Sequence, residues 1–235
     1  MLNWLSLHST FKINISILRL ALVQPQFAPN LYDMAAMLKA DRVVWNDMEQ
    51  WSRKGRTHRA AIKGEQGLQW VNIPIKTKDK KKPIREVRIK QNEDWIEPFW
   101  NALHHNYSEA TWYDFFAEEV EADIKKATDF ERLLDFNMYF FGRMSAYLEF
   151  DIEYELASTL PNFTANPDIL AEQLDADVLY QEHESKNYQW LSEKAEPALV
   201  DHPRYNQPGN EFLAGCSILD LLFNCGKESF RVLSL

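Results

Sequence analysis

The pattern of apolar and polar positions near the amino terminus predicts a strand, a helix and a second strand. Residues 17–23 are a short apolar run that ends at Gln24-Pro25, which is typical of a buried strand stopped by proline. Residues 31–40 carry apolar side chains at helical spacing, namely Leu31, Met34, Ala35 and Leu38. A second apolar run covers 42–45. We interpret this stretch as a βαβ-like opening.

The next segment predicts β-structure around a tight turn. Apolar and polar residues alternate over 68–75 and, more weakly, over 84–89. Glycines punctuate the four residues at 64–67, which favours a hairpin turn. We therefore expect two or three strands, antiparallel around this turn.

The period becomes helical from residue 92 to residue 148, and three apolar stripes follow one another. Their members are Trp95, Phe99, Leu103 and Tyr107; then Phe115, Phe116, Val120 and Ile124; then Phe130, Leu133, Leu134, Met138 and Phe141. Such stripes predict three helices in a middle layer, for which Thr111 and Thr128-Asp129 are candidate N-caps.

The last third of the chain predicts short elements. We expect strands at 152–156, 177–180 and 198–200, a helix from Asn166-Pro167-Asp168 to Leu174, and a closing helix at about 217–224. The fold class is therefore α/β, with a mixed β-sheet, flanking helices and a helical middle segment at about 92–148. We expect one domain over 17–235, preceded by an N-terminal extension at 1–16.

Composition and charge narrow the function. The formal net charge of −9 argues against a nucleic-acid binder, because phosphate neutralisation needs a basic surface. We expect no membrane span, because the apolar stretch at 13–23 is too short and is interrupted by polar residues, and we expect a cytoplasmic protein. Cys216 and Cys225 would project from opposite faces of one helix, so they would neither pair nor share a metal there.

Polar residues at the ends of the predicted strands are the first candidate site. Gln24 and Gln26 follow the first strand, where α/β sheets bind ligands, and a carboxamide both donates and accepts hydrogen bonds. Asp47 follows the second strand and would emerge at the same edge if the strands are parallel. It could act as a general base or pair with Arg59. Arg59 could instead hold an anionic group. Equally, the prolines could simply shape a connecting loop, with the glutamines bonded to backbone.

The second candidate site lies near the carboxyl terminus. His202 and Tyr205 offer an imidazole and a phenol for acid and base chemistry, although a surface histidine explains the pattern slightly better. Ser217, Asp220 and Asn224 share one face of the closing helix, so this polar stripe either faces water or lines a site. Asp220 would be costly to bury without a partner, and a structural buried network is the alternative to a catalytic role. We expect no metal site and no cofactor.

Two segments carry a resemblance to the bacterial WbqC-like protein family. They are Gln24-Pro25-Gln26-Phe27-Ala28-Pro29 and Ser217-Ile218-Leu219-Asp220-Leu221-Leu222-Phe223-Asn224-Cys225-Gly226. Further landmarks appear in the same order between them, namely Ala40-Asp41, Asp47, Trp70 with Ile73-Pro74, Trp95, Asn106-Tyr107 and Ala176-Asp177. The chain resembles the family from about residue 18 to residue 228.

The resemblance implies a bacterial, cytoplasmic enzyme of cell-surface polysaccharide, or O-antigen, biosynthesis, and acyl or aminoacyl transfer to an amino sugar is one activity it suggests. In that scheme Asp47, His202 or Asp220 handles the proton, while Gln24, Gln26, Arg59, Tyr205, Ser217 and Asn224 bind the substrate. The expected partner is a small-molecule or carrier-linked substrate, and the oligomeric state stays open. The family commonly has His where this chain has Val23. A non-catalytic binding or assembly protein of the same pathway is therefore the alternative.

Overall fold

A computed structural model describes residues 17–181, 191–209 and 211–234 of the chain. The extension expected at 1–16 lies outside these residues. The strands are β1 Arg19–Val23, β2 Arg42–Trp45, β3 Arg59–Gly64, β4 Gly67–Asn72, β5 Glu155–Leu156 and β6 Val178–Tyr180. The helices are α1 Leu31–Lys39, α2 Ile96–Tyr107, α3 Tyr113–Lys125, α4 Leu133–Leu148, α5 Pro167–Gln173, α6 Ile218–Cys225 and α7 Phe230–Leu233. Short 3₁₀ helices are η1 Thr77–Asp79, η2 Ile84–Glu86, η3 Lys126–Asp129, η4 Ala157–Thr159 and η5 Gly226–Ser229.

A parallel sheet of four strands, in the order β5-β2-β1-β6, forms one side of the molecule. The strands β1 and β2 are parallel neighbours with α1 between them in the chain, and Val23 lies opposite Trp45. This confirms the predicted βαβ opening. The carboxyl ends of β1 and β2 therefore meet at one edge of the sheet. Gln24 follows β1 and Asp47 follows β2, so both residues lie at this edge.

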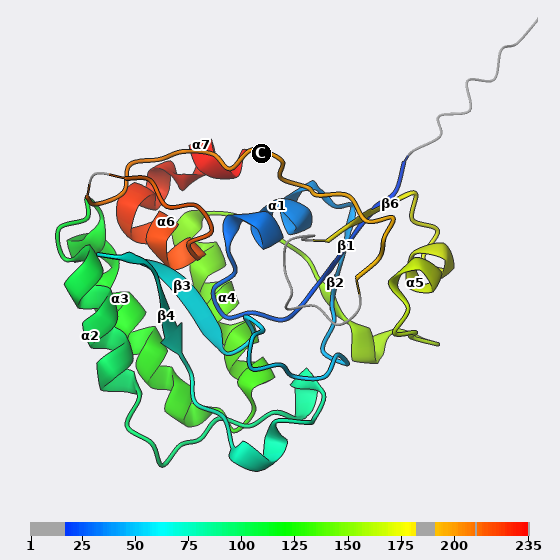
Figure 1. Ribbon diagram of the computed structural model, residues 1–235, viewed down its shortest axis with the longest axis horizontal. Coiled ribbons are helices and arrows are strands. Elements are labelled where there is room, and N and C mark those ends of the chain that lie inside the picture. Colours follow the sequence, from blue (N-terminus) through cyan, green and yellow to red (C-terminus); the bar gives the residue numbers. More distant parts are fainter. Residues whose placement is uncertain (1–16, 182–190, 210, 235) are drawn as a thin grey trace, which may run out of the picture.

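The sheet is covered on both faces, which explains why β1 is apolar throughout. Ala21 and Val23 contribute to the main core, whereas Leu20 and Leu22 belong to a smaller core that includes Leu170 of α5. Figure 1 shows α1 and α5 on opposite sides of the sheet. Because successive side chains of a strand point to opposite faces, an uninterrupted apolar run is what a doubly covered strand requires.

The strands β3 and β4 form the predicted antiparallel hairpin, with Gly64 opposite Gly67 at its turn. Gly67 has a φ of 122°, a backbone conformation that glycine adopts at little cost. Residues 84–89 do not form a third strand: they begin with η2 and make two isolated bridges, one between Ile75 and Ile89 and one between Arg88 and Arg132. Pro83, which has no N–H for a ladder, precedes this turn and favours it.

The helices α2, α3 and α4 form the predicted helical middle segment, and their apolar faces contribute to the same main core as the sheet. The predicted caps are wrong. Trp112 and Arg132 occupy the N-cap positions of α3 and α4, and neither side chain caps its helix. Trp112 instead donates its backbone N–H to the carbonyl of Phe223 (2.9 Å), so a tertiary contact determines where α3 begins.

Residues 198–200 were expected to form a strand, and this prediction is wrong. The short bridge in this region pairs Glu196 with Tyr180. The carbonyl of Ala198 accepts a hydrogen bond from Lys39 Nζ (2.8 Å), so a side chain satisfies this backbone group without a ladder. The strand expected at 152–156 is reduced to β5.

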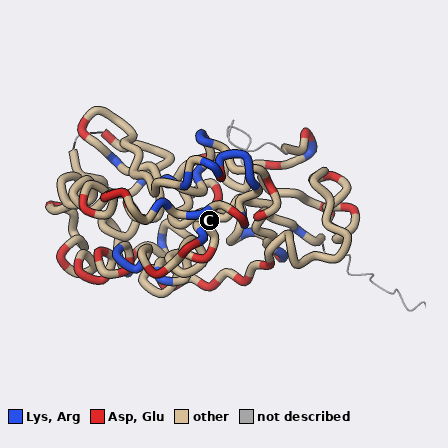
Figure 2. The backbone as a smooth tube through the Cα atoms, turned by 90° about the horizontal axis from the view of Figure 1, so that it is seen from below, with Lys and Arg blue, Asp and Glu red and all other residues tan. Residues whose placement is uncertain are grey.

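Basic and acidic residues are interspersed along much of the backbone (Figure 2). The helix α3 is the more acidic of the two neighbouring helices, with five Asp and Glu residues against one in α2. Over the described residues, no helix has both the length and the apolar character needed to cross a membrane.

Candidate functional site

Gln24 and Gln26 are held in buried contacts directly after β1. Gln24 Nε2 donates to Glu49 Oε1 (2.9 Å), and Gln26 Nε2 donates to Asp33 Oδ2 (2.6 Å). A Cβ added to Gly55 would lie 3.4 Å from Gln24 Oε1, so the backbone at Gly55 lies close to this amide. Both glutamines therefore belong to a polar region beneath the surface at the edge of the sheet.

Asp33 joins the first turn of α1 to this region. Asn30 caps α1 by accepting the backbone N–H of Asp33 (3.1 Å), and a carboxylate in a first helical turn is favoured by the helix dipole. Arg56 donates from its terminal nitrogen to Asp33 Oδ2 (2.7 Å), and both side chains are buried. Neither Asp33 nor Arg56 is among the site residues predicted from the sequence. Asp33 was hidden inside the apolar repeat of the helix.

Asp47 follows β2 at the same edge, as expected for parallel strands. Its side chain is completely buried, and Oδ1 accepts the backbone N–H of Ser158 (2.9 Å). Oδ2 is also buried and has no hydrogen-bond partner among the residues that the structure describes. Asp47 therefore presents one carboxylate oxygen that the described part of the fold does not use.

Several other buried polar atoms at this edge share that property. At this edge, and counting only contacts among the described residues, the following atoms besides Asp47 Oδ2 have no hydrogen-bond partner: Gln26 Oε1, Asn46 Oδ1, Thr57 Oγ1, His58 Nδ1 and Asn137 Oδ1. Asn137 Nδ2 donates to the carbonyls of Pro25 (3.1 Å) and Thr57 (2.8 Å), which fixes its oxygen as the atom left over. Leaving such a group buried and unpaired costs about 1–3 kcal/mol each. A polar ligand or an ordered water molecule bound there would offset that cost.

We refer to these residues together as the edge cluster: Gln24, Gln26, Asp33, Asn46, Asp47, Glu49, Arg56, Thr57, His58 and Asn137. His58 packs against Trp51, with ring centroids 4.8 Å apart. Burial lowers the pKa of His58 to about 4, and the charge of nearby Arg59 acts in the same direction. The imidazole is therefore neutral at pH 7.

Arg59 lies beside the edge cluster and is held differently from Arg56. Its guanidinium stacks over Trp70, 3.9 Å from the ring centroid, and its Nε donates to the carbonyl of Gly55 (3.0 Å). Burial lowers the pKa of Arg59, with further contributions from the charges of Arg56 and Arg53. The described contacts do not include the ion pair with Asp47 that the sequence left open.

The carboxyl-terminal candidates form a separate group, which we call the Asp220 cluster: Tyr107, Tyr205, Gln207, Asp220 and Asn224. Asp220 is fully buried. Its Oδ1 accepts from Tyr107 Oη (2.8 Å), and its Oδ2 accepts from Tyr205 Oη (2.6 Å) and Gln207 Nε2 (2.8 Å). Burial raises the pKa of Asp220, and these three hydrogen bonds oppose that shift. The carboxylate is thus surrounded by donors from α2 and the loop before α6.

The polar stripe of α6 neither faces water nor meets the edge cluster. Asn224 Nδ2 donates to the backbone carbonyl of Asp220 (2.8 Å), within the helix. The backbone N–H of Ser217 donates to the carbonyl of Ala61 (2.7 Å). Its buried Oγ has no hydrogen-bond partner among the described residues. The stripe is therefore part of a buried network.

His202 lies beside this network. Its Nδ1 is 2.9 Å from the carbonyl of Pro203, and its ring packs against Tyr32 (5.3 Å) and Phe212 (5.4 Å). Burial lowers its pKa. No described hydrogen bond joins the Asp220 cluster to the edge cluster, so the structure divides the sequence candidates between two places.

Metal and thiol chemistry find no support in the described residues. Those residues contain no group of three or more His, Cys, Asp or Glu placed to hold a metal ion. Cys216 and Cys225 are both free. Burial raises the pKa of Cys225 to about 11, with Asp220 adding to the shift, which disfavours a thiolate at pH 7.

The architecture defines the class: an α/β protein with a polar cluster at the carboxyl edge of its parallel strands. The chain belongs to the WbqC-like protein family, whose model matches residues 24–232. It is 29% identical over 231 residues to "Uncharacterized protein Rv1507c" of Mycobacterium tuberculosis, covering 90% of this chain and 95% of that protein. No solved structure matches.

Proposed function

We propose that this protein is an enzyme of bacterial cell-surface polysaccharide biosynthesis, which transfers an acyl or aminoacyl group to an amino sugar at the edge cluster. The resemblance to the WbqC-like family motivates the pathway. The observation that carries the choice of site is the set of buried polar atoms without partners in the described structure, at the carboxyl ends of β1 and β2. Ligands bind open α/β sheets at this end.

Asp47 is the best general base among the three sequence candidates. One of its carboxylate oxygens is unused by the described residues, whereas both oxygens of Asp220 accept hydrogen bonds. His202 Nδ1 lies against the carbonyl of Pro203, and His202 Nε2 is 3.4 Å from the backbone N–H of Gly215. Asp47 therefore has the clearest free capacity for a proton.

The proposed step is an attack of the amino-sugar nitrogen on the carbonyl carbon of the donor. A carbon–nitrogen bond forms, the bond between the carbonyl carbon and the leaving group breaks, and the proton of the amine passes through Asp47 to the leaving group. Gln24 and Gln26 orient the acceptor, and Arg59 holds an anionic part of the donor. Tyr205, Ser217 and Asn224, which the sequence suggested as substrate-binding residues, take no part in this step: Tyr205 and Asn224 donate to Asp220, and the backbone N–H of Ser217 donates to the carbonyl of Ala61.

The test combines a binding screen with detection of the product. Nucleotide-activated amino sugars and acyl and aminoacyl donors are screened by thermal shift, and active pairs are followed by mass spectrometry for the mass of the transferred group. In Asp47→Asn we expect turnover to fall by about 10²–10⁴, because a carboxamide cannot take the proton. Binding should persist, because the backbone N–H of Ser158 still finds an acceptor.

Asp94→Asn is the matched control, because Asp94 is exposed and lies in a loop. Full turnover in Asp47→Asn would remove Asp47 from the mechanism. Binding without turnover for every pair would overturn the enzyme and favour a binding protein of the same pathway. One observation supports that alternative: Val23, which stands where the family commonly has His, is 1% exposed and packs in the main core.

A further inference from the structure

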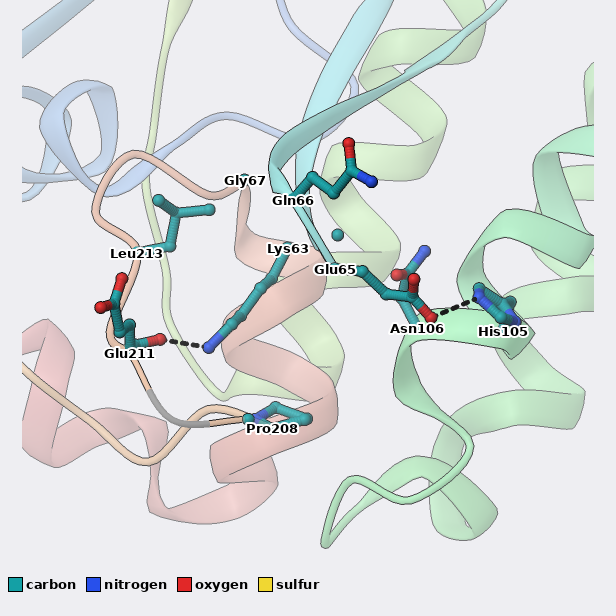
Figure 3. Close-up of a pocket in the computed structure, with 11 residues that line it drawn as sticks. Lys63, Glu65, Gln66, Gly67, His105, Asn106, Pro208, Glu211 and Leu213 are labelled. Carbon is teal, nitrogen blue, oxygen red and sulfur yellow. Dashed lines mark hydrogen bonds and ion pairs between the residues drawn. The ribbon is translucent and has the colours of Figure 1, made fainter.

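A cleft lies at the opposite end of the hairpin from the edge cluster. It has a volume of about 810 Å³ and is lined by the turn between β3 and β4, by α2 and by the loop before α6. Figure 3 shows Lys63 reaching from the hairpin toward Glu211 in this loop, with Asn106 of α2 on the other side. We call this region the hairpin cleft.

Two walls of the hairpin cleft are tied to the buried Asp220. Tyr107 Oη donates to Asp220 and accepts the backbone N–H of Lys63 (2.9 Å), which fixes the hairpin. Gln207 Nε2 donates to Asp220 and also makes one of two hydrogen bonds with the backbone of Leu213. Its Nε2 donates to the carbonyl of Leu213 (3.1 Å), and its Oε1 accepts the N–H of Leu213 (2.7 Å). The side chain of Gln207 thereby links the two sides of the loop that carries Glu211.

The hydrogen bonds to Asp220 give the hairpin cleft fixed walls. Burying a carboxylate is costly unless it is fully hydrogen-bonded, and Asp220 is buried and bonded from both walls. Lys63 Nζ adds a direct link between the walls by donating to the carbonyl of Glu211. The relative position of hairpin and loop is therefore fixed before any ligand arrives, which reduces the entropy cost of binding.

The side chains of the lining indicate the ligand chemistry. The lining combines donors and acceptors, namely the ammonium of Lys63, the amides of Gln66 and Asn106, and the carboxylates of Glu65 and Glu211. Glu65 Oε1 lies 3.5 Å from His105 Nε2, so one of these carboxylates faces the imidazole across the cleft lining. The carboxylates disfavour a phosphate or another strong anion. Pro208 and Leu213 add apolar surface beside these polar groups, so the lining is mixed. An uncharged ligand rich in hydroxyl groups fits this set.

We propose that the hairpin cleft is a second binding site, which holds a short, uncharged saccharide chain. Its hydroxyls would accept from Lys63 and exchange hydrogen bonds with the amides of Gln66 and Asn106. Asn106 Nδ2 already donates to Gln69 Oε1 (3.0 Å) and to the carbonyl of Ala102 (2.7 Å), which turns its oxygen toward other donors. The site does not include the edge cluster and does not depend on transfer activity there.

The test is NMR titration of the full chain with chitotriose and maltotriose, with trigalacturonate as the anionic counterpart. We expect amide shifts at residues 63–67 and at Asn106 for at least one neutral trisaccharide, and weaker binding of trigalacturonate. Gln66→Ala should weaken binding by about tenfold, which corresponds to about 1.4 kcal/mol. Asn92→Ala, which truncates an exposed amide elsewhere, should leave the affinity unchanged.

Two further variants separate the possible explanations. Gln207→Met removes the polar link between Asp220 and Leu213, so binding should weaken while amide protection in β1 and β2 is retained. Asp47→Asn should bind the trisaccharide as the parent chain does, whatever its effect on transfer. Absence of shifts with both neutral trisaccharides, shifts confined to other residues, or equal binding of trigalacturonate would each overturn the proposal.

Discussion

The edge cluster and the Asp220 cluster are both buried, yet the protein satisfies their polar atoms to different degrees. Asp220 accepts three hydrogen bonds and uses both carboxylate oxygens. At the edge of the sheet, Asp47 Oδ2, Thr57 Oγ1 and His58 Nδ1 are without hydrogen-bond partners over the residues described. A completed network stabilises a fold, whereas an incomplete one costs free energy that binding can offset. The Asp220 cluster therefore fits a structural role, and the edge cluster fits the ligand-binding role proposed above.

The largest effect is expected from Asp220→Ala. This change leaves the hydroxyls of Tyr107 and Tyr205 and the amide of Gln207 without their acceptor. We expect the free energy of unfolding to fall by about 4 kcal/mol, because each orphaned buried donor costs about 1–3 kcal/mol. Urea unfolding followed by circular dichroism measures this value.

Asp94→Ala is the control for Asp220→Ala, and it should change stability by less than about 0.5 kcal/mol because Asp94 is exposed. A loss below about 1 kcal/mol for Asp220→Ala would mean that the network does little for the fold. The contrast between the two clusters would then disappear.

The sequence predicted the sheet edge well and the Asp220 cluster poorly, for one physical reason. Apolar runs and their Pro and Asn boundaries are local signals, and they correctly placed β1, β2 and the Gln24 position after the strand. The partners of Asp220 are set by tertiary packing: Tyr107 lies 113 residues away in the chain. No local pattern identifies such a pairing.

The same limit explains why Arg56 is absent from the predicted site, whereas the resemblance included Arg59. Both arginines lie in one polar segment, and only the folded chain brings Arg56 within 2.7 Å of Asp33. The failed strand at 198–200 has a related cause, since a lysine from α1 satisfies the carbonyl of Ala198. Long-range contacts decided each of these cases.

A somewhat smaller effect is expected from His58, and it depends on pH. The pKa of His58 is lowered to about 4 in the folded protein, against about 6.5 when unfolded. Between these values the unfolded chain binds more protons, so stability falls as the pH falls from 6.5 to 4 and the penalty is complete below pH 4. The difference between these two pKa values corresponds to about 3 kcal/mol of stability.

The measurement for His58 is the unfolding free energy of the parent chain and of His58→Gln at several pH values between 4 and 7. The difference between the two proteins isolates this histidine from the carboxylates that titrate in the same range. We expect the stability of His58→Gln to decline less on acidification. Parallel curves for the two proteins would contradict the burial of a neutral imidazole.

The smallest effect on stability is expected from Thr57→Val, and its sign is the sharpest test of the comparison. Thr57 is 1% exposed, its backbone carbonyl is bound by Asn137, and its hydroxyl makes no hydrogen bond within the described structure. Valine keeps the branched shape and removes only the unpaired oxygen. We expect stability to rise by up to about 1 kcal/mol, because a buried unsatisfied polar group is removed.

Ligand binding at the edge cluster should weaken in the same variant, a trade-off expected where a polar group is retained for function. A clear loss of stability in urea unfolding would show that the hydroxyl serves the fold, and the edge cluster would then resemble the Asp220 cluster.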